Sequence, residues 1–149
     1  MKFAIIGATG NVGRKTIKIL EKSKLDIERL YLVASKNSLG KKINFKGDNL
    51  TVVALENFDF EKADITFFAA GSSIAEKYAK NASKKTVVID NSKFFRMDKD
   101  VPLIVPEVNS EDIKKHKNII ANPNCSTIQM VLALKPLHKK FNIKRVVVS

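Results

Sequence analysis

The sequence predicts a doubly wound α/β fold, a mainly parallel sheet with helices on both faces. Short apolar segments rich in Val, Ile and Phe recur along the chain. Segments with helical apolar spacing alternate with them, and glycine or polar turns separate the two kinds. The 149 residues, 44% of them hydrophobic, suffice for one domain with a sizeable core and are too few for two full domains.

The first half of the chain begins as strand, turn and helix. Residues 2–7 (KFAIIG) form an apolar run that glycine stops. From Val12, the positions Val12, Thr16, Ile17 and Leu20 share one helical face, which predicts a helix. The next expected segments are a strand over 30–34, a polar loop over 35–42, and two short extended pieces over 43–45 and 50–53.

The second half continues the alternation. We expect a core strand over 65–70 ended by Gly71, and then a helix to about residue 82 capped by Ser72 or Ser73. Further expected segments are a strand over 86–90, a loop through Pro102, an apolar piece over 103–105, helical turns near 111–117, a strand over 119–121, a buried helix from Asn124–Cys125 despite Pro136, and a strand over 145–148. We assign residues 1–142 to one domain and 143–149 to the first strand of a further catalytic or dimerisation domain.

Charge and composition exclude several classes of function. Lys and Arg number 27 against 15 Asp and Glu, a net charge of +12. Because 23 of the 27 are Lys, and Arg is the usual reader of bases and phosphates, we expect solvated lysine faces and no nucleic-acid partner. No segment reaches the roughly 18 apolar residues that a membrane span needs. A single cysteine indicates a reducing compartment, hence the cytoplasm, and no metal site is expected.

A glycine-rich turn, GATGNVG, lies between the first strand and the first helix. This is the context of a dinucleotide-binding fingerprint, although one residue is inserted relative to G-x-G-x-x-G. The amides at the helix N-terminus would face the phosphates of the cofactor. The turn therefore predicts a Rossmann-like domain whose cofactor contacts include Gly7, Thr9, Gly10, Asn11, Val12 and Gly13.

The end of the second strand indicates which cofactor is bound. NAD needs an acid there for the ribose 2′-hydroxyl, and residues 33–38 (VASKNS) contain none. Ser35, Asn37 and Ser38, with the nearby cations Lys36, Lys41 and Lys42, could hold a 2′-phosphate instead. The sequence therefore favours NADP(H) over NAD.

Cys125 lies in ANPNCSTIQ, at the start of the last helix. The amides and dipole of a helix N-terminus favour a thiolate, which would make Cys125 a nucleophile; the alternative is a small buried hydrophobe. The DNSKFFR loop brings Asn91 and Arg96, which could meet an anionic substrate or could lie in solvent. Ala70, Gly71 and Ser72 could border the cofactor or simply cap a helix.

Five blocks of the chain resemble the aspartate-semialdehyde dehydrogenase family in order and approximate spacing. They are GATGNVG, ASKNSLGK, DNSKFFR, VPEVN and NPNCST. A related family, N-acetyl-glutamyl-phosphate reductase, has glycine directly before its nucleophilic cysteine, where this chain has Asn124. A noncatalytic nucleotide- or nucleic-acid-binding module is a further alternative.

The resemblance implies a mechanism and a set of residue roles. Cys125 would form a thioester with the acyl group of aspartyl-4-phosphate, and NADPH would reduce it to the semialdehyde. Arg96 would bind the substrate phosphate, Asn124 would orient the substrate, and residues 9–12 with Asn37 and Ser38 would contact NADP, although members commonly carry Arg at the position of Asn37. A homodimer, and a place in lysine (diaminopimelate), threonine and methionine biosynthesis, are also implied.

General acid–base chemistry has only two histidine candidates in this sequence. His116 and His138 both lie among lysines, which would disfavour their protonation, and we expect neither to be catalytic. The resemblance implies that the catalytic histidine lies in a second domain, so the chain alone is expected to be inactive.

Overall fold

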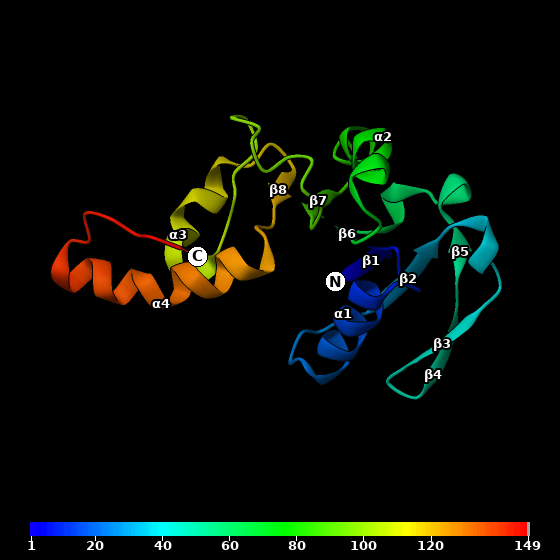
Figure 1. The fold of residues 1–149 in the computed structure, drawn as a ribbon. Helices are drawn as coiled ribbons and strands as arrows, with labels where there is room; N and C mark the ends of the chain where they lie inside the picture. Colours follow the sequence, from blue (N-terminus) through cyan, green and yellow to red (C-terminus); the bar gives the residue numbers. More distant parts are fainter. Residues whose placement is uncertain (149) are drawn as a thin grey trace.

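The computed structural model describes residues 1–148, and a six-stranded parallel sheet forms its centre (Figure 1). The strands lie in the order β5-β2-β1-β6-β7-β8, and every neighbouring pair is parallel. The chain therefore builds outward from β1 in both directions, as a doubly wound fold does. The bounds are Lys2–Ile6 (β1), Arg29–Ala34 (β2), Val53–Ala54 (β5), Ile65–Phe68 (β6), Val87–Asp90 (β7) and Ile119–Ala121 (β8).

Helices cover both faces of the sheet, as predicted, because successive strand residues point to opposite sides. Ile5 packs in a buried cluster with Ile17 of α1 (Asn11–Lys22). Its neighbour Ile6 packs in a second cluster with Ala75 and Ala79 of α2 (Ser72–Ala82). Figure 1 shows the two helices on opposite sides of the sheet. The small alanines let α2 approach the strands closely.

The face of α1 differs from the one that the sequence predicted. Ile17 and Leu20 are buried as expected, but Val12 is 44% exposed. Gly13 is buried in its place, because the helix packs its first turn directly against the backbone of the preceding glycine turn. The side chain of Val12 consequently points to solvent.

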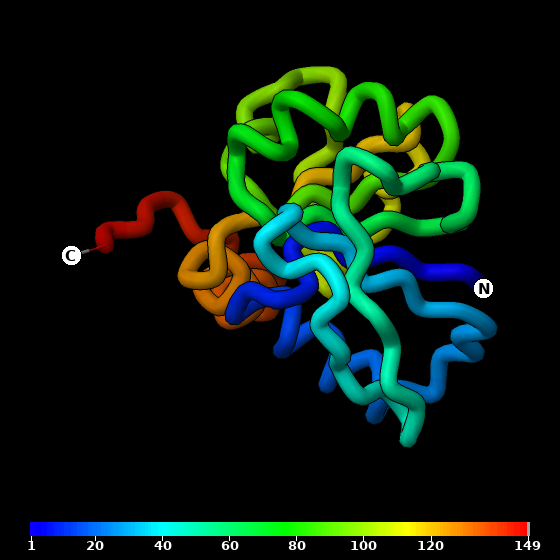
Figure 2. Tube along the Cα trace, turned by 90° about the vertical axis from the view of Figure 1, so that its right-hand side faces the viewer, coloured from blue at the N-terminus to red at the C-terminus, as the bar shows by residue number. Residues whose placement is uncertain are grey.

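The two extended pieces predicted over 43–45 and 50–53 form one hairpin, except that the end of the second piece joins the main sheet. β3 (Lys42–Phe45) and β4 (Asp48–Thr51) form an antiparallel hairpin, which extends beyond the main sheet in Figure 2. Lys46 and Gly47 turn it with φ of 52° and 93°. Val53 pairs instead with β2. The polar loop before the hairpin contains a 3₁₀ turn, η1 (Lys36–Ser38), and two more, η2 (Leu55–Asn57) and η3 (Phe60–Lys62), precede β6.

The cap of α2 is glycine and not serine. Gly71 is the N-cap residue with φ of 88°, and no side chain caps the helix. That backbone conformation suits glycine, so both serines lie inside the first turn.

Short helices connect β7 to β8. They are α3 (Pro106–Asn109) and η4 (Ser110–Lys115). Leu103, in the apolar piece predicted over 103–105, forms one bridge to Ala121. Hydrogen bonds from Lys115 and Asn109 to the Asp112 carboxylate stabilise its charged form and lower its pKa.

The last helix, α4 (Cys125–Phe141), forms as predicted but is not buried. None of its residues is buried, and it lies beside α3 at the β8 end of the sheet (Figure 1). Its apolar residues occur around most of its circumference, whereas the described chain packs against part of it only. The expectation of a core helix was therefore wrong for this part of the chain.

The strand predicted over 145–148 does not form. Residues 143–148 belong to no element and lead away from the sheet (Figure 2), because no other strand lies next to them to complete a ladder. Ser149 lies outside the described residues. The division of the chain at residue 142 stays a prediction. No helix among residues 1–148 has the length and apolarity to cross a membrane.

The contact between α1 and the glycine turn leaves no room for a side chain at Gly13. A Cβ on Gly13 would lie 2.2 Å from the carbonyl oxygen of Gly7, whereas a Cβ on Gly10 would meet that oxygen at 3.4 Å. We expect Gly13→Ala to lower the free energy of unfolding by about 2–4 kcal/mol and Gly10→Ala by much less. Urea unfolding of both variants checks this, and equal losses would contradict it.

Candidate active site

All candidate site residues lie at one edge of the sheet. Because the strands are parallel, the loops that follow β1, β2, β6, β7 and β8 meet at the edge formed by their carboxyl ends. The residues at this edge form two groups, one around the glycine turn and one around Cys125.

Close backbone packing shapes the glycine turn. Gly7 has φ of 89°, and its amide donates to the carbonyl oxygen of Val33 at 2.8 Å. A Cβ on Gly7 would lie 2.8 Å from the carbonyl oxygen of Ala69. The turn is thus held between β2 and the loop after β6, where only glycine fits.

The N-terminus of α1 follows directly from this turn. Gly10 is the N-cap residue, and no side chain caps the first-turn amides, which include those of Asn11, Val12 and Gly13. Uncapped amides at a helix N-terminus form a site for an anion such as pyrophosphate. The residues present therefore fit the phosphates of a dinucleotide.

A cleft of about 470 Å³ lies next to the turn. Of the predicted cofactor residues, Gly7, Thr9, Gly10, Ser35 and Ala70 line it. Sequence reasoning missed the walls that η2 and α2 contribute, since these elements carry no local motif. These residues are Leu55, Glu56, Ile74, Lys77 and Tyr78.

The loop after β2 is tied to the glycine turn. The hydroxyls of Ser38 and Thr9 lie 3.3 Å apart, and Ser38 is buried. Asn37 and the cations Lys36 and Lys41 are exposed on the same loop, and Lys42 is exposed at the start of β3. None of these four residues lines the cleft. Gly71 and Ser72 open α2 beside Ala70.

The loop after β7 is fixed by a buried carboxylate. Asp90 has no exposed surface, and it accepts hydrogen bonds from the amide of Ser92 at 3.0 Å and from its hydroxyl at 2.7 Å. The serine hydroxyl then accepts from the amide of Phe94 at 3.1 Å. This turn sets the path of the chain from Asn91 to Arg96.

Arg96 reaches back to the ends of two strands. Its Nε donates to the carbonyl oxygen of Asn122 at 3.0 Å, and its Nη2 donates to that of Asn91 at 3.1 Å. The side-chain amide of Asn122 donates to Oδ1 of Asn91 at 2.7 Å. The sequence suggested Asn91 and Arg96 but not Asn122, which lies three residues before the cysteine.

Cys125 is the first residue of α4 and is exposed, so it is not a small core residue. Asn124 is the N-cap, and its Oδ1 accepts from the Ser126 amide at 2.9 Å and the Ser126 hydroxyl at 2.7 Å. The Cys125 thiol donates to the same oxygen, with Sγ and Oδ1 3.7 Å apart. The site thus presents an accessible thiol at a helix N-terminus.

The two groups are separated by the width of the sheet between β1 and β8. Two strands, β6 and β7, lie between them, which corresponds to roughly 14 Å at about 4.8 Å a strand. Asn91, Arg96, Asn124 and Cys125 gather at one end of this distance. The glycine turn, Ser35 and Ser38 gather at the other.

Neither histidine lies in these groups. His116 accepts a hydrogen bond from the amide of Asn118 at 3.0 Å, just before β8 and so at the opposite edge of the sheet. His138 lies about 20 Å along α4 from Cys125. The described residues contain no cluster of three or more His, Cys, Asp or Glu that could hold a metal ion.

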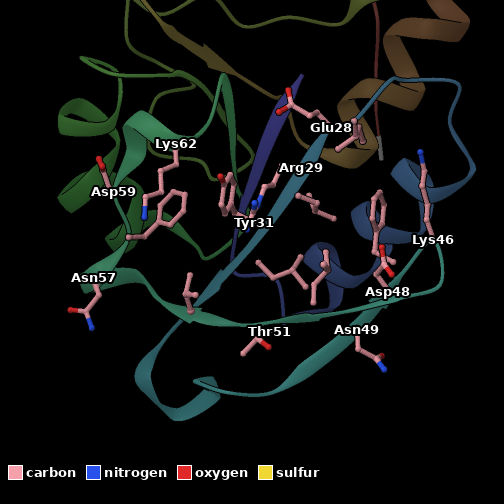
Figure 3. Close-up of a pocket in the computed structure, with 17 residues that line it drawn as sticks. Glu28, Arg29, Tyr31, Lys46, Asp48, Asn49, Thr51, Asn57, Asp59 and Lys62 are labelled. Carbon is pink, nitrogen blue, oxygen red and sulfur yellow. The ribbon is translucent and has the colours of Figure 1, made fainter.

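A larger hollow than this cleft lies away from this edge. It measures about 670 Å³ and runs between the first residues of β2 and the β3–β4 hairpin, near Arg29, Tyr31 and Asp48 (Figure 3). It exists because β5 pairs only with Val33 and Ala34, which leaves the rest of that edge of β2 open. None of the predicted site residues lines it.

Known proteins are similar to this chain in both sequence and fold. The model of the semialdehyde dehydrogenase NAD binding domain matches residues 2–116. Aspartate-semialdehyde dehydrogenase of Aquifex aeolicus is 55% identical over 99% of this chain and 45% of the relative, and that of Bacillus subtilis is 48% identical over 98% and 42%. The chain thus spans less than half the length of these relatives.

Solved structures give the same picture. Aspartate semialdehyde dehydrogenase II of Vibrio cholerae superposes with a TM-score of 0.94 at 45% identity, over 97% of this chain and 44% of that one. The enzyme of Candida albicans, solved with NADP, gives 0.81 at 32% identity, over 95% and 48%. The chain therefore belongs to the semialdehyde dehydrogenase family, with the family's NAD binding domain at residues 2–116.

Proposed function

We propose that this chain is the cofactor- and nucleophile-carrying part of an NADP-dependent aspartate-semialdehyde dehydrogenase. The observation that carries the proposal is the exposed thiol of Cys125 at the start of α4, at the same sheet edge as the glycine turn. The names of the relatives reported above support it. They also argue against the related N-acetyl-glutamyl-phosphate reductase, and no arrangement among residues 1–148 favours a noncatalytic module.

In this proposal Cys125 forms and releases a thioester. Its thiolate attacks the acyl carbon of aspartyl-4-phosphate; the C–S bond forms, and the bond to the phosphate oxygen breaks. Arg96 receives the departing phosphate, which leaves with the bonding electron pair. When bound, NADPH supplies the hydride that reduces the thioester carbon. The C–S bond then breaks, and the semialdehyde and the thiolate are released.

The residues around the glycine turn would hold NADP. The first-turn amides of α1 meet the pyrophosphate, and Ser35 and Ala70 border the adjoining cleft. Ser38, Asn37 and the exposed lysines of that loop would recognise the 2′-phosphate. The Candida albicans structure, which contains NADP, supports this choice of cofactor.

Asn124 has two tasks in the proposal. Its Oδ1 caps α4, which leaves its Nδ2 to orient the substrate next to the thiol. Asn91, whose carbonyl oxygen binds Arg96, would border the substrate on the other side.

The remaining machinery is proposed to lie outside residues 1–142. Residues 143–149 would open a second domain that supplies the general acid–base histidine. The complete protein would be a homodimer in the cytoplasm.

This division predicts binding without turnover. We expect the 149-residue chain to bind NADPH more tightly than NADH, and to show no phosphate-dependent reduction of NADP with aspartate semialdehyde. Fluorescence titration and absorbance at the nicotinamide band measure the two properties. Robust turnover would refute the need for a second domain.

The thiol should respond to the cofactor. We expect iodoacetamide to alkylate Cys125 alone and NADP to change the alkylation rate, since the nicotinamide would lie beside the thiol. Mass spectrometry follows the label, and Cys125→Ser is the control that should remain unlabelled. A rate that NADP leaves unchanged would count against this placement.

The cap should control the reactivity of Cys125. Asn124→Asp keeps a capping oxygen but places a negative charge near Sγ. At 4 Å in water this charge repels the thiolate by about 1 kcal/mol. We expect alkylation at neutral pH to slow roughly fivefold. Asn124→Ala removes the cap and should destabilise the chain by about 1 kcal/mol without that charge effect. Equal rates for Asn124→Asp and the unchanged chain would contradict the prediction.

A further inference from the structure

Asn122 joins the two strand ends nearest to Cys125. Asp90 of β7 is paired with Ala121 of β8, so the next residues, Asn91 and Asn122, are neighbours just beyond the ladder. The amide of Asn122 continues the ladder by donating to the carbonyl oxygen of Asp90 at 2.8 Å. Its side chain then crosses to Asn91.

Asn122 also determines how Arg96 is held. An arginine has five N–H donors in a planar fork. One bonds the backbone of Asn122 and another that of Asn91, so the Nε–Nη2 edge of the fork faces the sheet. The three remaining N–H groups consequently point away from the strand ends.

The supports of this arrangement are buried. Asp90 and Ala121 have no exposed surface, and Pro123 is buried on the other side of Asn122. A guanidinium that is hydrogen-bonded to such a buried support loses little further freedom when it binds an anion. A free arginine side chain instead loses rotamer entropy worth up to about 2 kcal/mol.

We propose that Asn122 is a positioning residue for anion binding at Arg96. It holds Asn91 through its side chain and the guanidinium through its backbone carbonyl, so that the free edge of Arg96 faces a phosphate beside Cys125. The inference rests on the proposed function, since that function places a phosphate there.

Inorganic phosphate is the probe. Its effect on the rate at which iodoacetamide alkylates Cys125 is measured at constant ionic strength, together with NADP affinity and thermal stability. The variants are Asn122→Ala, Asn91→Ala, the double variant and Arg96→Ala. Asn118→Gly is the matched control, because Asn118 lies at the other end of β8, donates its side-chain amide to Ser83 at 3.0 Å and has φ of 61°, which glycine tolerates.

We expect Asn122→Ala to raise the phosphate concentration for half-maximal effect about three- to tenfold, as the loss of one hydrogen bond implies. Its NADP affinity should stay unchanged. The double variant should be no weaker than either single variant, because both remove the same hydrogen bond. Asn118→Gly should leave the phosphate response intact.

Two results would overturn this inference and leave the proposed function standing. One is an unchanged phosphate response in Asn122→Ala while Arg96→Ala loses it. The other is a parallel loss of stability, NADP affinity and phosphate response, which would indicate a merely structural role. If phosphate has no effect even on the unchanged chain, the phosphate site of the proposed function fails and the inference fails with it.

A second measurement reads the geometry directly. Arg96 is one of four arginines, so the NMR signal of its Nε–H group can be followed. Asn122→Ala keeps the carbonyl oxygen that accepts from Nε but removes the side-chain bond that fixes this strand end to Asn91. We therefore expect this proton to exchange faster with solvent in Asn122→Ala, whereas that of Arg14, which donates to the carbonyl oxygen of Thr9 at 3.0 Å, should not change. Equal exchange of the Arg96 proton in both proteins would overturn the proposal.

Discussion

All six strands of the main sheet run in the same direction, and this constraint places every loop with site chemistry at one edge. The pairing is held by apolar residues that alternate between the two faces, such as Ile5 toward α1 and Ile6 toward α2. A slip of one residue would exchange these faces. The register of the core therefore also sets the positions of Gly7, Asn91 and Asn122.

At that edge the backbone provides much of the chemistry. Glycine packing brings α1 close against the turn, and because the N-cap residue Gly10 has no side chain, the first amides of α1 stay uncapped. Around the thiol, backbone carbonyls hold Arg96, and a single asparagine oxygen caps α4 and meets the thiol. Both groups lie at a helix N-terminus, one beside the cleft at the glycine turn and one at the thiol of Cys125.

Several features were predictable because they depend on neighbours in the chain. The strand–glycine–helix order around Gly10, the apolar segments of β1 and β6, and the place of Cys125 at a helix start are all local patterns. The face of α1 was not predictable in detail, since Val12 and Gly13 exchange roles according to how closely the helix packs. The predictions that α4 is buried and that residues 145–148 form a strand were wrong, because each feature depends on a partner element rather than on its own residues.

The sequence by itself determined the alternation of elements, the glycine turn and the identity of the candidate nucleophile. Apolar periodicity and glycine positions act over a few residues, so they can be recognised without the fold. Only the tertiary structure decided that Asn122 and Arg96 meet and that Glu56 and Lys77 face the same cleft as Thr9. These contacts join residues far apart in the chain, and the parallel sheet alone brings their strands to the same edge.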